Sequence, residues 1–325
     1  MVSADTFWQN LPTIFKKTVI EHLDYKSRCC LRKCSKSDRE LEEQCPVSLE
    51  KIILKLGFNK TARMMFEECD SELDVFYPAS DVIQDFCQIF RNPRSKCSIL
   101  EINGFARGSD PLTTDIIQEL AENLLLSHRV KIEKLKFWVN VFHAEENFVN
   151  IIKSMDPKHL KSIILCHVIS KNGIELLAAT EHWARLKKIG FGEIEDPDFD
   201  SFTHLEKIRF AVKTINPQDV WKLVQSFVKF QNFLTANRPN GSYFDISITH
   251  DANVPSILKY FQERNIELKN EPIRSGDLPK YIHTQRFKFT KVAVDEGNTV
   301  EKVILILKMN NWSVYGFICK ADRYS

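Results

Sequence analysis

The clearest pattern along the chain is a hexad with apolar residues at its first, fourth and sixth positions. Alternation over a few residues predicts a strand with one buried face. Four stretches match the hexad well and two match it loosely, at intervals more irregular than those of regular leucine-rich repeats. They are Ile132–Phe137, Leu160–Leu165, Leu186–Phe191 and Leu205–Phe210, then Cys97–Ile102 and Tyr243–Ile248.

Helix-like segments separate these strands. They cover Asp115–Leu126, Glu145–Met155, Ile174–Trp183, Asp219–Leu234 and Val254–Glu263. A strand and helix that repeat can bury their apolar faces by stacking, so we expect an α/β fold with an irregular leucine-rich-repeat-like solenoid over residues 95–283. A different alternation over residues 284–325 predicts strands that cap the solenoid, with turns at residues 296–298 and 310–311. These strands are Phe287–Val292, Val300–Leu307 and Val314–Cys319.

Strand alternation also predicts which side chains form an open face of the sheet. The inward set is Leu135, Phe137, Ile163, Leu165, Ile189, Phe191, Ile208 and Phe210. Candidate binding residues on the outward face are Glu101, Lys134, Lys136, Trp138, Ile164, Lys188, Lys207, Arg209 and Ser247. Trp138 is either an exposed anchor or packed under a loop. The lysines form either an ordinary solvated face or a site for an acidic partner.

Residues 7–50 have the spacing of three short helices. Leu11-Pro12 begins the first, Asp24 is placed to cap the second, and Ser37 to Glu40 form a capping-box pattern for the third. We expect the second helix to carry Cys30, Leu31 and Cys34 inward, with its basic residues, Arg28 among them, in water. A helical linker region is expected over residues 51–94, with a helical stretch from about residue 49 to residue 89.

The N-terminal segment resembles an F-box. The resemblance rests on an ordered set of residues: Leu11-Pro12, Ile14, Val19-Ile20, Leu23-Asp24, Ser27-Arg28, Leu31-Arg32, Cys34-Ser35 and Arg39. It implies docking onto the Skp1 adaptor of a cullin-RING ubiquitin ligase. The contact residues it implies are Leu11, Pro12, Ile14, Phe15, Ile20, Leu23 and Leu31. On periodicity alone, the same apolar residues could instead hold these helices against the rest of the chain.

Residues from about 128 to 250 resemble the FTH domain that follows the F-box in a large, nematode-type protein family. The match rests on His159–Ile163, Glu181–Lys187 and Phe202–Ile208. The resemblance implies a domain that is presented to substrates. It implies no catalytic residues.

Composition limits the classes of function that remain. The 325 residues carry a net charge of only +2, which argues against a dedicated nucleic-acid binder. Glycine is scarce, at 10 residues, so Gly-rich phosphate loops are missing, while 23 phenylalanines supply bulky apolar side chains. Nine scattered cysteines favour reduced thiols. With no expected leader or membrane span, we expect a cytoplasmic or nuclear protein.

Possible metal and catalytic motifs do not meet the requirements of their chemistry. Asp196, Asp198 and Asp200 resemble the start of a calcium loop, but Ser201 and Lys207 stand where glycine and a bidentate glutamate are needed. Cys29, Cys30 and Cys34, with His22, lack the separated pairs of a zinc site. We therefore expect no cofactor and no catalysis by this chain.

Two hypotheses follow from the sequence. In the first, the chain is a substrate adaptor of an SCF-type ubiquitin ligase, with Skp1 and a cullin on one side and an unknown protein substrate on the other. In the second, it is a ubiquitin-independent scaffold whose basic strands, with Lys136 and Arg209, bind an acidic peptide or RNA.

Overall fold

The computed structural model divides the chain into two compact units. Unit 1 comprises residues 1–165 and 180–185, and unit 2 comprises residues 166–179 and 186–325. The structure describes residues 8–57, 61–68, 71–104, 111–126, 129–140, 145–228, 239–250, 252–267, 282–292 and 300–321.

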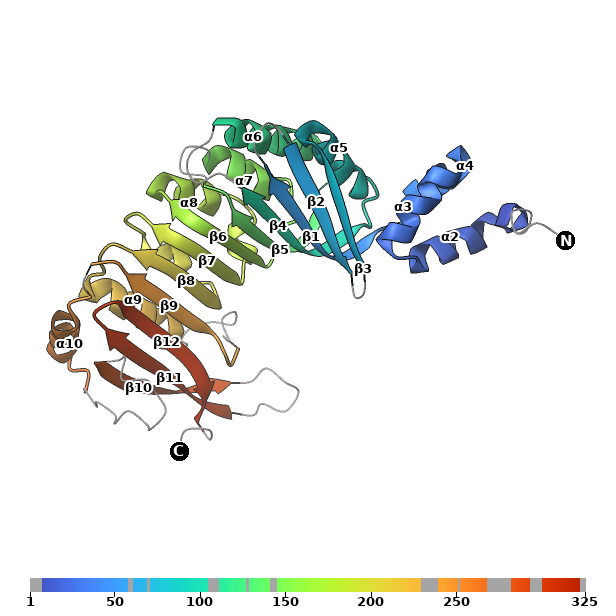
Figure 1. Ribbon diagram of the computed structural model, residues 1–325. Coiled ribbons are helices and arrows are strands. Elements are labelled where there is room, and N and C mark those ends of the chain that lie inside the picture. The colour runs from blue at the N-terminus through green and yellow to red at the C-terminus, as the bar shows by residue number, and fades with distance from the viewer. Residues whose placement is uncertain are drawn as a thin grey trace. The chain divides into compact units, whose positions relative to one another are not determined.

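Unit 1 combines N-terminal helices with a mixed sheet (Figure 1). Its elements are α2 (Thr13–His22), α3 (Tyr25–Cys34), α4 (Lys36–Glu43), β1 (Ser48–Leu56), β2 (Thr61–Glu68), β3 (Ser71–Pro78), α5 (Ala79–Ile89), β4 (Lys96–Gly104), α6 (Pro111–Leu126), β5 (Lys131–Trp138), α7 (Glu145–Lys153), the first half of β6 (Ser162–Ile169) and the 3-10 turn η1 (Trp183–Arg185). The strand order is β3-β2-β1-β4-β5-β6. Strands β1, β4, β5 and β6 run parallel, and β2 and β3 are antiparallel to their neighbours.

Helices α5, α6 and α7 cover one face of this sheet (Figure 1). Val82, Ile83 and Phe86 of α5 recur at helical spacing and are buried. Phe137 of β5 meets Phe148 of α7 edge to face, with ring centroids 5.2 Å apart. The apolar stripe of each helix therefore forms one core with the inward side chains of the strands.

The prediction of a helical linker over residues 51–94 is wrong for its first part, where β1, β2 and β3 lie, and only α5 is helical. Leu49, Ile52, Ile53 and Leu56 have the spacing of a helix face, but Leu54 between them is also buried. β1 pairs with β4 on one side and β2 on the other. Pairing with distant strands therefore overrides the local helical pattern.

Unit 2 also contains a mixed sheet, with strand order β7-β8-β9-β12-β11-β10. Its elements are the second half of β6, α8 (Lys171–Ala178), β7 (Lys188–Ile194), the 3-10 turn η2 (Phe199–Phe202), β8 (Lys207–Val212), α9 (Pro217–Val228), β9 (Tyr243–Ile248), α10 (Val254–Glu263), β10 (His283–Val292), β11 (Val300–Asn310) and β12 (Ser313–Lys320). Strands β7, β8 and β9 are parallel, whereas β10, β11 and β12 form an antiparallel set that joins β9 through β12.

One close contact fixes how β12 lies beside β9. Gly316 of β12 is in register with Phe244 of β9. A Cβ atom at position 316 would lie 2.2 Å from the Phe244 ring, which is fully buried. Glycine is required here because the buried aromatic ring occupies the space of a side chain.

The prediction that the hexads form strands is confirmed. Each of the six hexads overlaps one of the strands β4 to β9, and the three C-terminal strands lie where the second alternation predicted them. The eight side chains predicted to point inward are at most 4% exposed. The predicted turn at residues 296–298 falls outside the described residues.

Candidate protein-interaction surfaces

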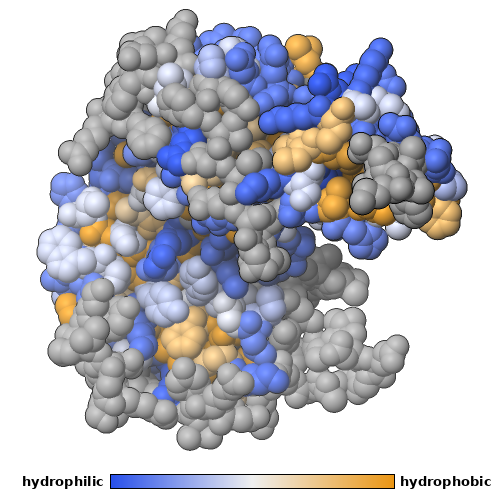
Figure 2. Space-filling model, turned by 45° about the vertical axis from the view of Figure 1, so that its right-hand side comes forward, coloured by the Kyte–Doolittle hydropathy of each residue, from blue (hydrophilic) through white to orange (hydrophobic). Residues whose placement is uncertain are grey.

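Helix α2 presents an apolar surface to solvent. Ile14, Phe15 and Val19 are 71%, 60% and 43% exposed. We call these three side chains the α2 ridge. In Figure 2, orange side chains interrupt the hydrophilic surface of this N-terminal region. Contiguous exposed apolar side chains on one helix are typical of a surface that a partner covers.

The other predicted contact residues of this region differ in exposure. Pro12 is exposed and occupies the N-cap position of α2 without a capping hydrogen bond, and Leu11, Leu23 and Leu31 are partly buried. Ile20 is fully buried, so the prediction that it contacts a partner directly is wrong. Its place six residues after Ile14 puts it on a different side of the helix, where it packs into the core.

The helix caps of this region confirm one prediction and correct another. Asp24 accepts a hydrogen bond from the Ser27 backbone N–H at 2.6 Å and caps α3; this bond lowers the pKa of Asp24. The cap of α4 is Ser35, not Ser37, because the Ser35 hydroxyl accepts from the Asp38 backbone N–H.

The inward face predicted for α3 is also corrected. Cys30 and Cys34 are exposed, and the basic Arg28 is 3% exposed. The helix therefore buries a charged side chain in place of two thiols.

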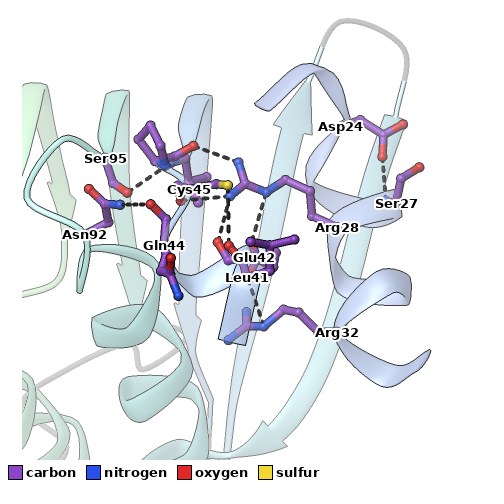
Figure 3. A network of polar contacts seen from close by, with 12 residues as sticks. Asp24, Ser27, Arg28, Arg32, Leu41, Glu42, Gln44, Cys45, Asn92 and Ser95 are labelled. Atoms are coloured by element: carbon purple, nitrogen blue, oxygen red, sulfur yellow. Dashed lines mark hydrogen bonds and ion pairs between the residues drawn. The ribbon is translucent and has the colours of Figure 1, made fainter. Parts of the chain in front are cut away.

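Arg28 is the centre of a buried polar network that joins α3 to α4 (Figure 3). Its Nε donates to Glu42 Oε1 at 2.9 Å, and its other nitrogens donate to the carbonyls of Pro46 at 2.7 Å and Cys45 at 2.9 Å. Glu42 is also 3% exposed, and its second oxygen lies 3.2 Å from Arg32 Nε. A buried guanidinium is tolerated because its fork of donors is satisfied.

The segment after α4 is tied to the sheet of unit 1 (Figure 3). The Val47 backbone N–H donates to Ser95 Oγ, and the Val47 carbonyl accepts from the Lys96 N–H. The Asn92 side chain donates to the Gln44 carbonyl at 2.8 Å. These bonds hold the N-terminal helices against the strands, although nearly fifty residues of chain separate the partners.

The outward face of unit 1 contains an ion network centred on Glu101. Glu101 Oε2 lies 3.3 Å from Lys136 Nζ and 3.7 Å from Lys51 Nζ, and Lys51 also reaches Glu67 at 2.9 Å. Burial alone would raise the pKa of Glu101, but hydrogen bonds from Asn103 and Lys136 and the charges of the lysines lower it. The two lysines are therefore neutralised within the protein.

The remaining predicted residues on the unit 1 face are accessible. Trp138 of β5 is 45% exposed, which favours the anchor interpretation over packing under a loop. Lys134 and Ile164 are partly exposed on β5 and β6. In register, Lys136 lies between Glu101 and Ile164.

The outward face of unit 2 gathers three cations. Lys188 of β7 lies directly opposite Lys207 of β8, and Arg209 lies opposite Asp245 of β9. Arg209 donates to Asp245 through Nε and Nη2, both at 2.9 Å from the same carboxylate oxygen. Ser247 is exposed further along β9.

A row of aromatic rings continues this face and was missed by the sequence analysis. The Tyr243 and Tyr315 ring centroids are 6.4 Å apart, and those of Tyr315 and Phe317 are 5.5 Å apart. All three side chains are partly exposed. Alternation within residues 314–319 was the available signal, but it needed the pairing of β12 with β9 to place these rings together.

Comparison with protein-family models assigns both regions. Residues 8–58 match the F-box domain, and residues 114–263 match the FTH domain. The chain has an F-box followed by an FTH domain. The α2 ridge and the Arg28 network lie in the F-box match, and the cations of unit 2 lie in the FTH match. Searches of curated proteins and of solved structures found no match.

Both matches extend beyond the boundaries expected from the sequence. The F-box match includes β1, and the FTH match begins within α6 and ends with α10. The F-box therefore contributes a strand to the sheet of unit 1.

The Glu181-His182-Trp183 segment of the FTH domain has a structural role in unit 1. His182 is 1% exposed, and one ring nitrogen, Nε2, lies 2.9 Å from the Met155 carbonyl. Burial lowers the pKa of His182. Glu181 pairs with Arg129 at 2.6 Å on the surface. A neutral ring that donates from Nε2 fits this position.

Several features of the described residues bear on possible metal binding and catalysis. In the part of the chain that the structure describes, no group of His, Cys, Asp and Glu side chains is arranged to hold a metal ion. Asp198 caps η2, and Asp200 pairs with Lys222 at 2.7 Å. Burial raises the pKa of Cys87 to about 11 and that of Cys97 to about 12, so these thiols are poor nucleophiles at neutral pH.

A search of the described helices for membrane spans found none with the length and apolar character that crossing requires.

Proposed function

We propose that this protein is a substrate adaptor of an SCF-type ubiquitin ligase. The observation that carries the proposal is the α2 ridge, since three large apolar side chains are exposed on one helix within the F-box match. The proposed partner at this ridge is a Skp1-like adaptor protein, and through it a cullin. Leu11, Pro12, Leu23 and Leu31 would contribute at the edges of the contact.

The proposed mechanism is an increase in effective concentration. The FTH domain would hold a protein substrate while the F-box is bound to the ligase, so that substrate lysines stay near a charged ubiquitin-conjugating enzyme. The buried Arg28 to Glu42 pair joins α3 to α4, and the bonds of Val47 fix these F-box helices to the sheet of unit 1, which supports this role. Under this proposal the chain itself performs no catalysis and acts in the cytoplasm or nucleus.

The adaptor proposal is tested by co-purification of a Skp1-like protein. We expect Ile14→Ser with Phe15→Ser to abolish capture, since partly or fully desolvated apolar anchors contribute most of the energy of such contacts. The matched control is Thr13→Ala, an exposed polar position on the same helix.

Thermal unfolding of all three proteins separates loss of binding from loss of folding. Capture that is absent from the wild type, or equal in wild type and double variant, would contradict the adaptor proposal.

We further propose that the strand and helix pairs form an irregular leucine-rich-repeat-like solenoid with β10 to β12 as its cap. Parallel pairing within β4 to β6 and within β7 to β9 supports this interpretation. The strand faces with Glu101, Lys134, Lys136, Trp138 and Ile164 in unit 1, and Lys188, Lys207, Arg209 and Ser247 in unit 2, are the proposed substrate surfaces.

A further inference from the structure

The two lysines at the start of the unit 2 strands are an uncompensated pair of like charges. Lys188 and Lys207 lie directly opposite each other across β7 and β8, an arrangement that disfavours the folded state. Among the described residues, no carboxylate forms an ion pair with either side chain. Burial, then the charges of Lys207 and Arg209, lowers the pKa of Lys188.

The carboxylates on this face do not remove the excess positive charge. Asp245 forms an ion pair with Arg209. Glu193 lies at the other end of β7, in register with Ala211. The positive charge that has no carboxylate partner among the described residues is therefore concentrated at Lys188 and Lys207.

An apolar surface adjoins these two lysines. Lys207 is in register with Tyr243, which begins the ring row of Tyr243, Tyr315 and Phe317. Partly exposed aromatic rings are typical anchors of protein interfaces because they bury a large area with few rotatable bonds. Charge and aromatic area therefore lie side by side in one unit.

We propose that this cation–aromatic surface binds an acidic, extended segment of a protein substrate, with carboxylates at Lys188 and Lys207 and an apolar side chain on the ring row. The inference deepens the proposed function, on which it rests, by naming the class of substrate segment. Charge complementarity favours a short run of Asp and Glu. RNA is disfavoured because the chain, with a net charge of +2, lacks the broad basic surface that neutralises many phosphates.

The test uses the full chain purified with its Skp1-like partner and a short fluorescein-labelled peptide of Asp, Glu and one Phe. Fluorescence anisotropy measures the affinity. We expect Lys188→Glu with Lys207→Glu to weaken binding by about tenfold or more. We expect Tyr315→Ala to weaken it several-fold for this peptide, but not for one with Ala in place of Phe.

The matched control is Lys187→Glu, which changes the charge at a neighbouring position whose side chain pairs with Glu206. The proposal is supported if this control binds like the wild type. Equal affinity for a peptide of Asn and Gln, an equal effect of Lys187→Glu, or stronger binding of oligouridine would overturn it. Skp1 co-purification of each variant is measured in parallel, so failure of the peptide site and failure of the adaptor function are told apart.

Discussion

The outward strand faces of units 1 and 2 contain the same basic residue types, but their charges are arranged differently. In unit 1, Lys51 and Lys136 share Glu101, within 3.7 Å and 3.3 Å. In unit 2, Lys188 and Lys207 face each other without a described carboxylate partner. The number of lysines along a strand therefore does not indicate whether a face is open to an acidic ligand, because strand register decides which charges are neutralised.

The lysine pKa shifts reflect this difference. Burial would lower the pKa of Lys51, but hydrogen bonds and charges from Glu67 and Glu101 outweigh burial and raise it. For Lys188, burial and the charges of Lys207 and Arg209 act together and lower the pKa. The face of unit 1 stabilises the charged form of Lys51, whereas the face of unit 2 destabilises the charged form of Lys188.

The largest expected effect tests whether the buried ion pair between Arg28 and Glu42 stabilises unit 1. Arg28→Ala leaves Glu42 buried without its main partner, so we expect the free energy of unfolding to fall by about 3–5 kcal/mol. Arg32→Ala is the control, since Arg32 contacts the same carboxylate from a position that is 19% exposed and its loss leaves the Arg28 contact intact. Chemical denaturation measures both, and equal losses would contradict a central role for Arg28.

A smaller effect is expected from removing the negative charge at the centre of the ion network on the unit 1 face. Glu101→Gln removes the charge between Lys51 and Lys136, and we expect a loss of about 1 kcal/mol at neutral pH. The folded pKa of Glu101 is lowered from 4.5, so the stability it provides is present above that pH and is lost as pH falls through the folded pKa.

Denaturation of the Glu101→Gln variant at several pH values should therefore lack this acid-dependent part. The control is Glu133→Gln, an exposed partner of Lys161. If the Glu101→Gln variant also gains affinity for the acidic peptide, the difference between the two faces depends on this carboxylate. An unchanged pH profile would argue against it.

The smallest effect concerns Lys188 itself. We expect Lys188→Met to leave stability unchanged or to raise it by about 0.5 kcal/mol at neutral pH, because it removes a like-charge pair at a partly exposed site. Since the folded pKa of Lys188 is below 10.5, its unfavourable contribution is relieved as pH rises through the folded pKa toward 10.5.

Lys51→Met is the comparison, because the raised pKa of Lys51 gives stability that is lost only as pH rises above 10.5. Denaturation from neutral to alkaline pH gives the difference in the free energy of unfolding between each variant and the wild type. This difference should change in opposite directions for the two variants. The same trend in both would contradict the contrast between the faces.

The sequence predicted the elements of the fold best where period two was unambiguous. The hexads place every inward residue correctly, because strand geometry alone decides which side chains share a face. The segment 48–78 was misassigned because Leu49, Ile52, Ile53 and Leu56 also fit a helix, and only pairing with β4 and β2 resolves the ambiguity.

The candidate sites were predictable only in part for the same reason. Local spacing predicted an apolar face on α2 but not which of its residues are exposed: Val19 was not among the predicted contacts, and Ile20, which was, is buried. The burial of Arg28 depends on Glu42, fourteen residues away, and on carbonyls of the next segment. The neutral face of unit 1 depends on Lys136 meeting Glu101 across thirty-five residues. Such contacts depend on which distant segments meet in the fold, and the local sequence pattern does not show this.

The bonds of Val47 to Ser95 and Lys96 limit where the chain can be cut. A truncation at residue 50 would divide β1 after its third residue and strip the Ser95 hydroxyl and the Lys96 backbone of their partners. Such a shortened protein would lose sheet structure together with the F-box. Substitutions on the exposed side of α2 are therefore the cleaner way to separate the partners of the two domains.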